Sequence, residues 1–128
     1  MSLFSYTTVN IQPTRIGVIV LQSDETIERD LRVMRGDADV FVSRVPSGQE
    51  VTAETLESMT GHIAASASLF PQTISFDAVG YGCTSGTAQI GVSKIERLVK
   101  FGTQTKTVSQ PVSALVAACE HLGLKCIA

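Results

Sequence analysis

The chain has 128 residues, of which 44% are hydrophobic and 17% are charged, and its formal net charge is -2. This length is typical of one globular domain with a real core, and the charge excludes the basic surface that binds a phosphate backbone. No apolar run reaches the roughly 18 residues that a membrane helix needs, and no secretion signal opens the chain, so we expect a cytoplasmic protein with no nucleic-acid or membrane partner.

The first elements alternate between strand and helix patterns. Residues 15–21 form a continuous β-branched run, which is typical of a strand buried on both faces of a parallel sheet. Ser23 or Asp24 can cap the helix that follows, and Gly36 ends it. The apolar face of this helix is expected to carry Ile27, Leu31 and Met34.

The middle of the chain repeats this alternation. Residues 39–45 are predicted to form the second strand, and after a turn at 46–48 Thr52 caps one long helix that ends at Pro71. Its apolar stripe consists of Leu56, Met59, Ile63, Ala67 and Phe70. The third strand, 75–82, follows.

The last elements are predicted in the same way. Ser93 and Glu96 indicate a capping box at the start of a helix that Gly102 ends, and a short fourth strand covers 105–108. Pro111 lies in the first turn of the next helix, and the last strand is 124–128. The apolar stripe of that helix consists of Val112, Leu115, Val116, Cys119 and Leu122.

This order of elements predicts the fold class. Alternating strands and helices indicate an α/β protein with a three-layer, doubly wound, flavodoxin-like and mainly parallel sheet. We expect residues 1–128 to form a single α/β domain. In such folds ligands bind at the carboxyl ends of the strands.

The three cysteines show no metal-ligand spacing, and we expect neither a metal site nor a disulfide framework. Cys119 and Cys126 are expected to be small buried hydrophobes, because they fall on an apolar helix stripe and in a predicted strand. Cys83 differs, because it follows the third strand and precedes a polar turn whose N–H groups favour a thiolate. It is therefore the candidate catalytic residue.

The turn after Cys83 carries the candidate ligand-binding groups. Thr84, Ser85 and Gly86 are either ordinary turn formers or donors of hydroxyl and backbone N–H groups to a carboxylate or an oxyanion. A phosphate site is not indicated, because residues 80–86 lack the lysine of a P-loop and have a glycine spacing one residue too long for a dinucleotide.

The end of the first strand should border the same crevice. Gln22, Ser23 and Asp24 are placed there, although capping alone would explain Ser23 or Asp24. His62 and His121 are expected to be solvated or to cap a helix, and no nucleophile and histidine arrangement follows from spacing.

Three segments together resemble a known family: 15–20 (RIGVIV), 23–26 (SDET) and 80–86 (GYGCTSG). The chain is similar to the maleate isomerase and arylmalonate decarboxylase branch of the aspartate/glutamate racemase superfamily, and within it to the decarboxylase-like proteins of ectoine utilisation. The resemblance covers the chain from about residue 15 onward, and its most specific part is the segment after the third strand.

The resemblance implies a cofactor-independent enzyme of two similar α/β halves, each supplying one cysteine to a site between them. Cys83 matches the first-half cysteine, and Thr84 and Ser85 match the residues that hold the carboxylate of a small carboxylic acid substrate. It also implies that this chain is the N-terminal half, with the second half beyond Ala128. We therefore expect the chain alone to be inactive and, because its sheet edges and one face are uncovered, to self-associate.

Three functions stay open at this point. The first is a cysteine-dependent isomerase or racemase, the second a decarboxylase-like protein of ectoine catabolism, and the third a non-catalytic carboxylate-binding module. Cys83 favours the first over the second, since arylmalonate decarboxylases have glycine at this position. Asp24 stands where maleate isomerases carry asparagine, and its charge would repel a dicarboxylate, which argues against maleate as the substrate.

Overall fold

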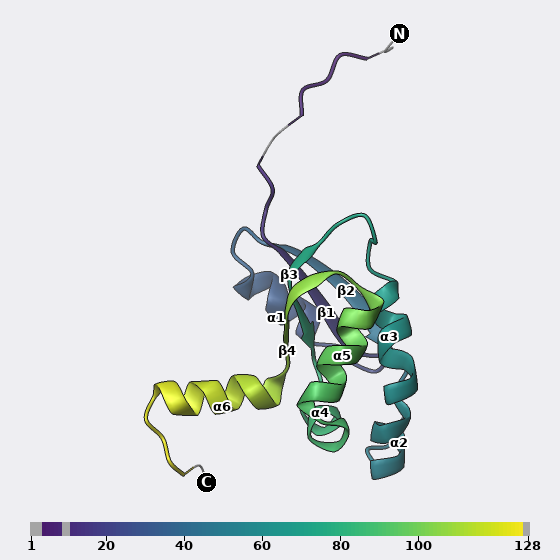
Figure 1. Ribbon diagram of the computed structural model, residues 1–128, viewed down its shortest axis with the longest axis vertical. Coiled ribbons are helices and arrows are strands. Elements are labelled where there is room, and N and C mark those ends of the chain that lie inside the picture. The colour runs from purple at the N-terminus through teal and green to yellow at the C-terminus, as the bar shows by residue number, and fades with distance from the viewer. Residues whose placement is uncertain (1–3, 9–10, 127–128) are drawn as a thin grey trace.

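The computed structural model describes residues 4–8 and 11–126, and its centre is a four-stranded sheet (Figure 1). The strand order is β2-β1-β3-β4, and all pairs are parallel. The strands are β1 (Arg15–Leu21), β2 (Asp39–Val45), β3 (Phe76–Tyr81) and β4 (Thr105–Ser109). The bounds predicted for β1 and β2 are confirmed, whereas β3 is one residue shorter than predicted at each end and β4 is one residue longer at its carboxyl end.

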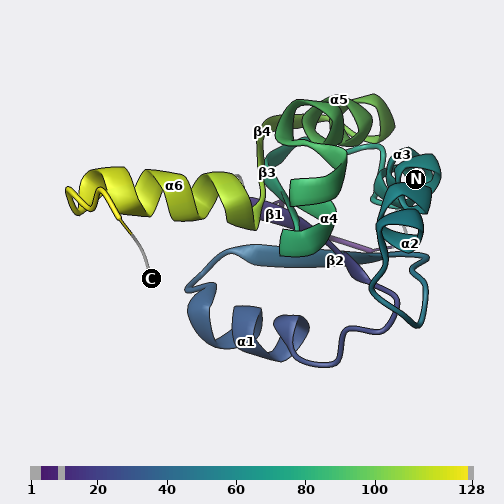
Figure 2. The same cartoon turned by 90° about the horizontal axis from the view of Figure 1, so that it is seen from below.

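Helices lie on both faces of the sheet, which confirms the doubly wound three-layer fold (Figure 2). The first face carries α1 (Ile27–Met34). The second carries α2 (Ala53–Ser58), α3 (Thr60–Ser68), α4 (Thr84–Ile90) and α5 (Val92–Gly102). The last helix, α6 (Pro111–His121), projects away from the sheet (Figures 1 and 2).

The core lies between the sheet and the helices of the second face. Ile19 and Val79 from the sheet and Ile63 and Val99 from the helices are fully buried there. This asymmetry follows from the helix sequences, since α3 and α5 both present buried apolar residues, whereas α1 buries none. Of the apolar face predicted for α1, Ile27 and Leu31 are partly buried, whereas Met34 is 72% exposed.

The long helix predicted after Thr52 is interrupted at Met59. Thr52 does cap the first part, and it exchanges hydrogen bonds with Thr55 in a capping box. The break precedes Thr60 and Gly61, two residues of low helix propensity, so α2 ends and α3 begins there. The predicted apolar stripe survives the break, because Met59, Ile63, Ala67 and Phe70 are all buried.

Two predictions near the end of the chain are wrong. Ser93 lies inside α5 and makes no capping box, because Gly91, with a φ of 93°, is the N-cap and starts the helix directly after α4. Residues 124–126 form no strand and are exposed, and residues 127–128 lie outside the described part of the chain. The start of α6 is confirmed, with Pro111 in its first turn.

The amino ends of three strands are joined through Asp77. Its carboxylate accepts a hydrogen bond from Lys106 Nζ on β4 at 2.6 Å and from the Arg15 backbone N–H on β1 at 2.9 Å. The hydrogen bond from Lys106, followed by that from Arg15, holds the pKa of Asp77 below its ordinary value of 3.8. The ionised form therefore stabilises the fold.

The stability that Asp77 contributes should be lost in acid. Because its pKa is lower in the folded chain, the contribution is complete above pH 3.8 and disappears as the pH falls through the lowered value. Urea unfolding near neutral pH and well below pH 3.8 should show a smaller acid loss for Asp77→Asn than for the unchanged chain. Replacement of the exposed Asp37 by asparagine is the control and should leave the acid loss unchanged; equal losses in all three chains would contradict the prediction.

Within the described residues, no helix is both long enough and apolar enough to cross a membrane.

Candidate functional site

The candidate residues gather at the carboxyl edge of the two central strands. Ile19 of β1 pairs with Tyr81 of β3, and the Gly82 N–H donates to the Ile19 carbonyl at 2.8 Å. Cys83 therefore leaves the sheet beside the residues that follow β1. The chain proceeds from β1 to β2 on one side and from β3 to β4 on the other, so this is the point where the strand order reverses and where such sheets bind ligands.

Cys83 is the N-cap of α4. Its Sγ accepts a hydrogen bond from the Gly86 N–H at 3.2 Å, and its carbonyl accepts from the Thr87 hydroxyl at 2.6 Å. The expectation that N–H groups face the thiol is confirmed. The expected turn at residues 84–87 is instead the first turn of a helix, because the thiol itself serves as the capping group.

The thiol is buried, with 7% of Cys83 exposed, and it belongs to the hydrophobic core cluster. A Cβ on Gly86 would lie 2.8 Å from Tyr81 Oη, 3.0 Å from Cys83 Sγ and 3.0 Å from Met59 Cε. These atoms converge on one point, and only glycine leaves room for them. The sulfur of Cys83, the hydroxyl of Tyr81 and the methyl group of Met59 therefore surround Gly86, whose N–H donates to that sulfur.

The hydroxyl of Tyr81 is part of this arrangement. It donates to Met59 Sδ at 3.7 Å, a weak acceptor, and the residue is 1% exposed. Burial, and secondarily the neighbouring charge of Cys83, raises the pKa of Tyr81 well above its ordinary value. The phenol consequently keeps its proton, which it donates to Met59 Sδ.

The other predicted residues after Cys83 divide into two groups. Thr84 and Ser85 are exposed in the first turn of α4, whereas Gly86 is buried beneath them. The first N–H groups of a helix have no partner within the helix. Thr84 and Ser85 thus offer hydroxyl and N–H donors to solvent, while the N–H of Gly86 is used by Cys83.

The three candidate residues after β1, Gln22, Ser23 and Asp24, differ in their surroundings. Asp24 accepts hydrogen bonds from the N–H groups of Thr26 and Ile27 at 3.0 and 2.9 Å, so it caps the start of α1. Gln22 is exposed, and Ser23 lines a cavity of about 70 Å³ that Met59 also lines. Capping accounts for Asp24, whereas Gln22 and Ser23 have no such structural task.

Arg44 belongs to this edge and was missed in the sequence. Its guanidinium donates to the carbonyls of Leu21, Gln22 and Asp24 at 3.1, 3.3 and 2.8 Å, and it also pairs with Glu28. It holds the loop after β1 in place and puts a positive charge beside Asp24. Arg44 is the only basic residue of β2 (DVFVSRV), and this was the available signal.

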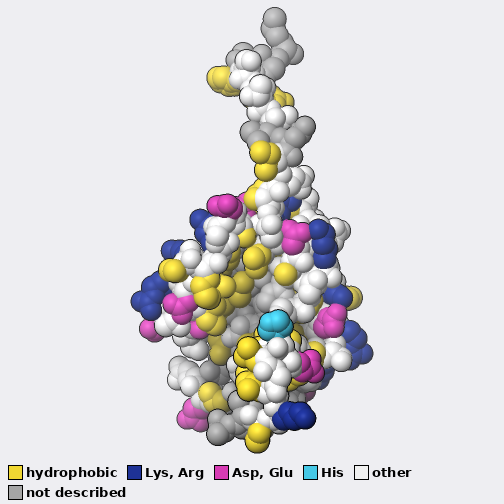
Figure 3. All heavy atoms as spheres, turned by 90° about the vertical axis from the view of Figure 1, so that its left-hand side faces the viewer, with side chains coloured by type: hydrophobic (Ala, Val, Ile, Leu, Met, Phe, Trp, Pro, Cys, Tyr) yellow, Lys and Arg dark blue, Asp and Glu magenta, His cyan; other side chains and the backbone are white. Residues whose placement is uncertain are grey.

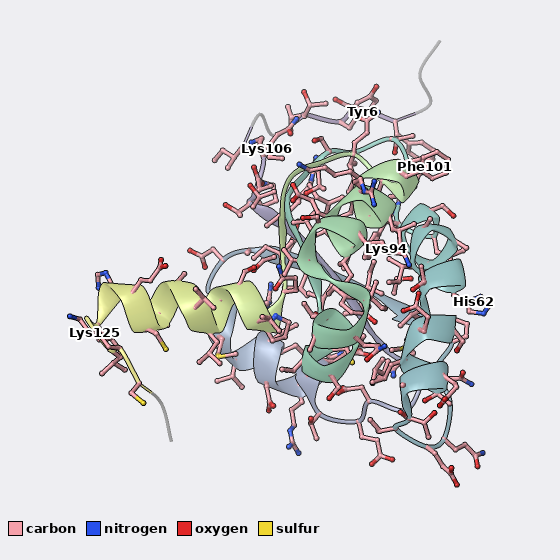
Figure 4. All side chains as sticks on the ribbon, turned by 60° about the horizontal axis from the view of Figure 1, so that its bottom comes forward. Tyr6, His62, Lys94, Phe101, Lys106 and Lys125 are labelled. Atoms are coloured by element: carbon pink, nitrogen blue, oxygen red, sulfur yellow. The ribbon has the colours of Figure 1, made fainter. Side chains whose placement is uncertain are left out.

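The remaining candidates lie away from this edge. Cys119 is partly exposed and Cys126 is exposed, so the expectation that both are buried is wrong. His62 points outward from α3, as expected (Figure 4). His121 is exposed at the end of α6. In the described part of the chain, no group of three or more His, Cys, Asp or Glu could hold a metal ion. A cavity of about 560 Å³ lies at the opposite edge of the sheet, near Thr105.

Known proteins resemble this chain in fold. No protein-family model matches the sequence, and no curated protein does. Maleate isomerase Iso from Pseudomonas putida S16 superposes with a TM-score of 0.71 at 20% identity, and a cysteine-to-alanine variant of that enzyme, solved with maleate, superposes with a TM-score of 0.69 at 20% identity. Each match covers 88% of this chain and 50% of the other, so the chain spans about half the length of these neighbours. At the level of the fold the resemblance inferred from the sequence is confirmed: the chain has the α/β fold of about half of that maleate isomerase.

Proposed function

We propose that the chain is one half of a cofactor-independent, cysteine-dependent isomerase or racemase that acts on a small carboxylic acid. The observation that carries the proposal is a thiol capping a helix at the strand-order reversal of a fold shared with a maleate isomerase. Cys83 acts as the thiolate, and Thr84 and Ser85 hold the carboxylate with their hydroxyl and N–H groups.

The chemistry requires a negative charge to be stabilised in two species, first the thiolate and then the enediolate. In the isomerase route the thiolate adds to one carbon of a carbon–carbon double bond, and the electron pair moves onto the carboxylate as an enediolate. The remaining single bond rotates, the electron pair returns and the thiolate leaves. The donors at the start of α4 favour both the thiolate and the enediolate.

A second candidate function is a carboxylate-binding module without turnover. The burial of Cys83 favours this alternative, since a reagent or substrate must reach a sulfur in a residue that is only 7% exposed. Decarboxylation, as in the ectoine-related proteins, has less support, because Cys83 occupies a position that is glycine in arylmalonate decarboxylases. Reactivity of the thiol separates the catalytic and binding functions.

Alkylation measured against pH tests the proposal. In a chain carrying Cys119→Ala and Cys126→Ala, only Cys83 can react. An ordinary thiol has a pKa of about 8.5, so its alkylation rate climbs about tenfold per pH unit below that value. We expect a much shallower dependence for Cys83, measured with iodoacetamide and mass spectrometry, and slower alkylation when a small monocarboxylate such as propionate is added.

The matched control retains Cys126, which is exposed, and carries Cys83→Ala and Cys119→Ala. Its rate should follow the ordinary pH dependence and should not respond to propionate. If Cys83 reacts only after unfolding, or with the same pH dependence as Cys126, catalysis by this thiol is contradicted. Protection by propionate without enhanced reactivity would instead support the binding module.

A further inference from the structure

The helix α6 contacts α4, but its apolar side is largely uncovered in the structure. Leu115, Val116 and Leu122 are 52%, 51% and 68% exposed, and no residue of the helix is buried. Leu124, just beyond the helix, is 49% exposed. Several large apolar side chains of the projecting helix α6 are therefore in contact with water (Figure 1).

A complementary surface lies on the same chain, on the face of the sheet that carries α1. An apolar groove of about 310 Å³ is bounded by Ile27 and Leu31 of α1 on one side and by Pro111 and Ala114 of α6 on the other. Its floor consists of Ile16, Val18, Ala78 and Gly80. Figure 3, seen from the side toward which α6 projects, shows hydrophobic side chains gathered beside this helix.

The connection between β4 and α6 prevents the helix from filling its own groove. Gln110 is the single residue between the two elements, and it is only 6% exposed. Its side chain caps α6 by accepting from the Ser113 N–H at 2.8 Å and donating to the Ser113 hydroxyl at 2.7 Å. Pro111 also fixes the backbone of the first turn. The first turn is thereby held at the rim of the groove while the rest of the helix points away.

We propose that two copies of this chain form a closed dimer by exchanging α6, each helix covering the groove of the other copy. The apolar side of α6 and the apolar groove lie next to each other on the same chain. A two-fold symmetric dimer can therefore bury both surfaces of both copies at once. A short connection that cannot fold back is the usual structural cause of such exchange. The proposal specifies a surface for the self-association expected from the sequence, and it is independent of the chemistry of Cys83.

Light scattering coupled to size-exclusion chromatography tests the proposal. The unchanged chain should have twice its monomer mass of 13.6 kDa. Leu115→Glu should raise the dissociation constant at least about tenfold, since the glutamate would carry an unpaired charge into an apolar groove. Phe101→Glu is the matched control, because Phe101 is 87% exposed at the end of α5 on the other face, and this variant should remain dimeric.

Mixing two variants tests the exchange itself. Leu115→Glu impairs the helix but keeps the groove, whereas Leu31→Glu impairs the groove but keeps the helix. Each should be monomeric alone, and an equimolar mixture should recover a heterodimer through its one intact helix and groove pair. Circular dichroism checks that both variants are folded. A monomeric unchanged chain, a dimer indifferent to Leu115→Glu, equal loss in Phe101→Glu, or a mixture that stays monomeric would each overturn the proposal.

Discussion

Replacing Phe76 with alanine should lower the free energy of unfolding by about 3–5 kcal/mol, as removal of a fully buried aromatic side chain does elsewhere. Phe76 has no exposed surface and begins β3. Its ring packs edge-on against Phe41 of β2, with centroids 5.4 Å apart, and is tilted against Phe70 at 5.1 Å. Alanine would leave a cavity between the sheet and the end of α3 that these rings cannot fill without leaving their own positions.

Urea unfolding measures the effect, and Phe101→Ala is the matched control. Phe101 is 87% exposed, so the same substitution there should change the free energy of unfolding by no more than about 0.5 kcal/mol. If the two variants lost similar amounts, the three-ring cluster would not be the centre of the core. A loss at Phe76 large enough to unfold the chain at zero urea would agree with the prediction.

The four strands of the sheet were predictable because their pattern is local, whereas the further strand expected at 124–128 is not formed at the described residues 124–126. The β-branched run at 15–21 has a single plausible structure once both faces are buried, and β1 has those bounds. The helix interruption at Met59 was not predictable from apolar spacing, because the stripe continues through it. Spacing reports which face is buried, whereas the continuity of the backbone depends on weak helix formers such as Gly61.

The candidate site could likewise be predicted only in part. The position of Cys83 at the end of β3 and its contact with helix N–H groups could be inferred from the order of residues. The burial of its sulfur could not, because it depends on Met59 and Tyr81, which meet only in the fold. The role of Asp24 as a cap and of Arg44 as the clamp of its loop likewise depends on which strands are neighbours.

Gly102→Ala should destabilise the chain by about 1–3 kcal/mol or more, the cost typical of overpacking a close contact. A Cβ at Gly102 would lie 2.3 Å from the Ala64 carbonyl oxygen and 2.6 Å from the Ala67 Cβ, both on α3. Neither atom belongs to a flexible side chain, so α3 and α5 would have to separate. Their close approach, and not only the end of a helix, explains glycine at this position.

The same substitution at Gly61 should have the opposite sign. A Cβ there would meet no atom within 4 Å, and glycine inside a helix costs about 0.5–1 kcal/mol relative to alanine, so Gly61→Ala should stabilise the chain by a similar amount. Urea midpoints of the two variants should therefore move in opposite directions from that of the unchanged chain. Alanine is intrinsically preferred over glycine at both helix positions, and the two sites differ only in the contact that the new Cβ would make. If both substitutions stabilised the chain, α3 and α5 would therefore have to lie farther apart than the contact of Gly102 with Ala64 requires.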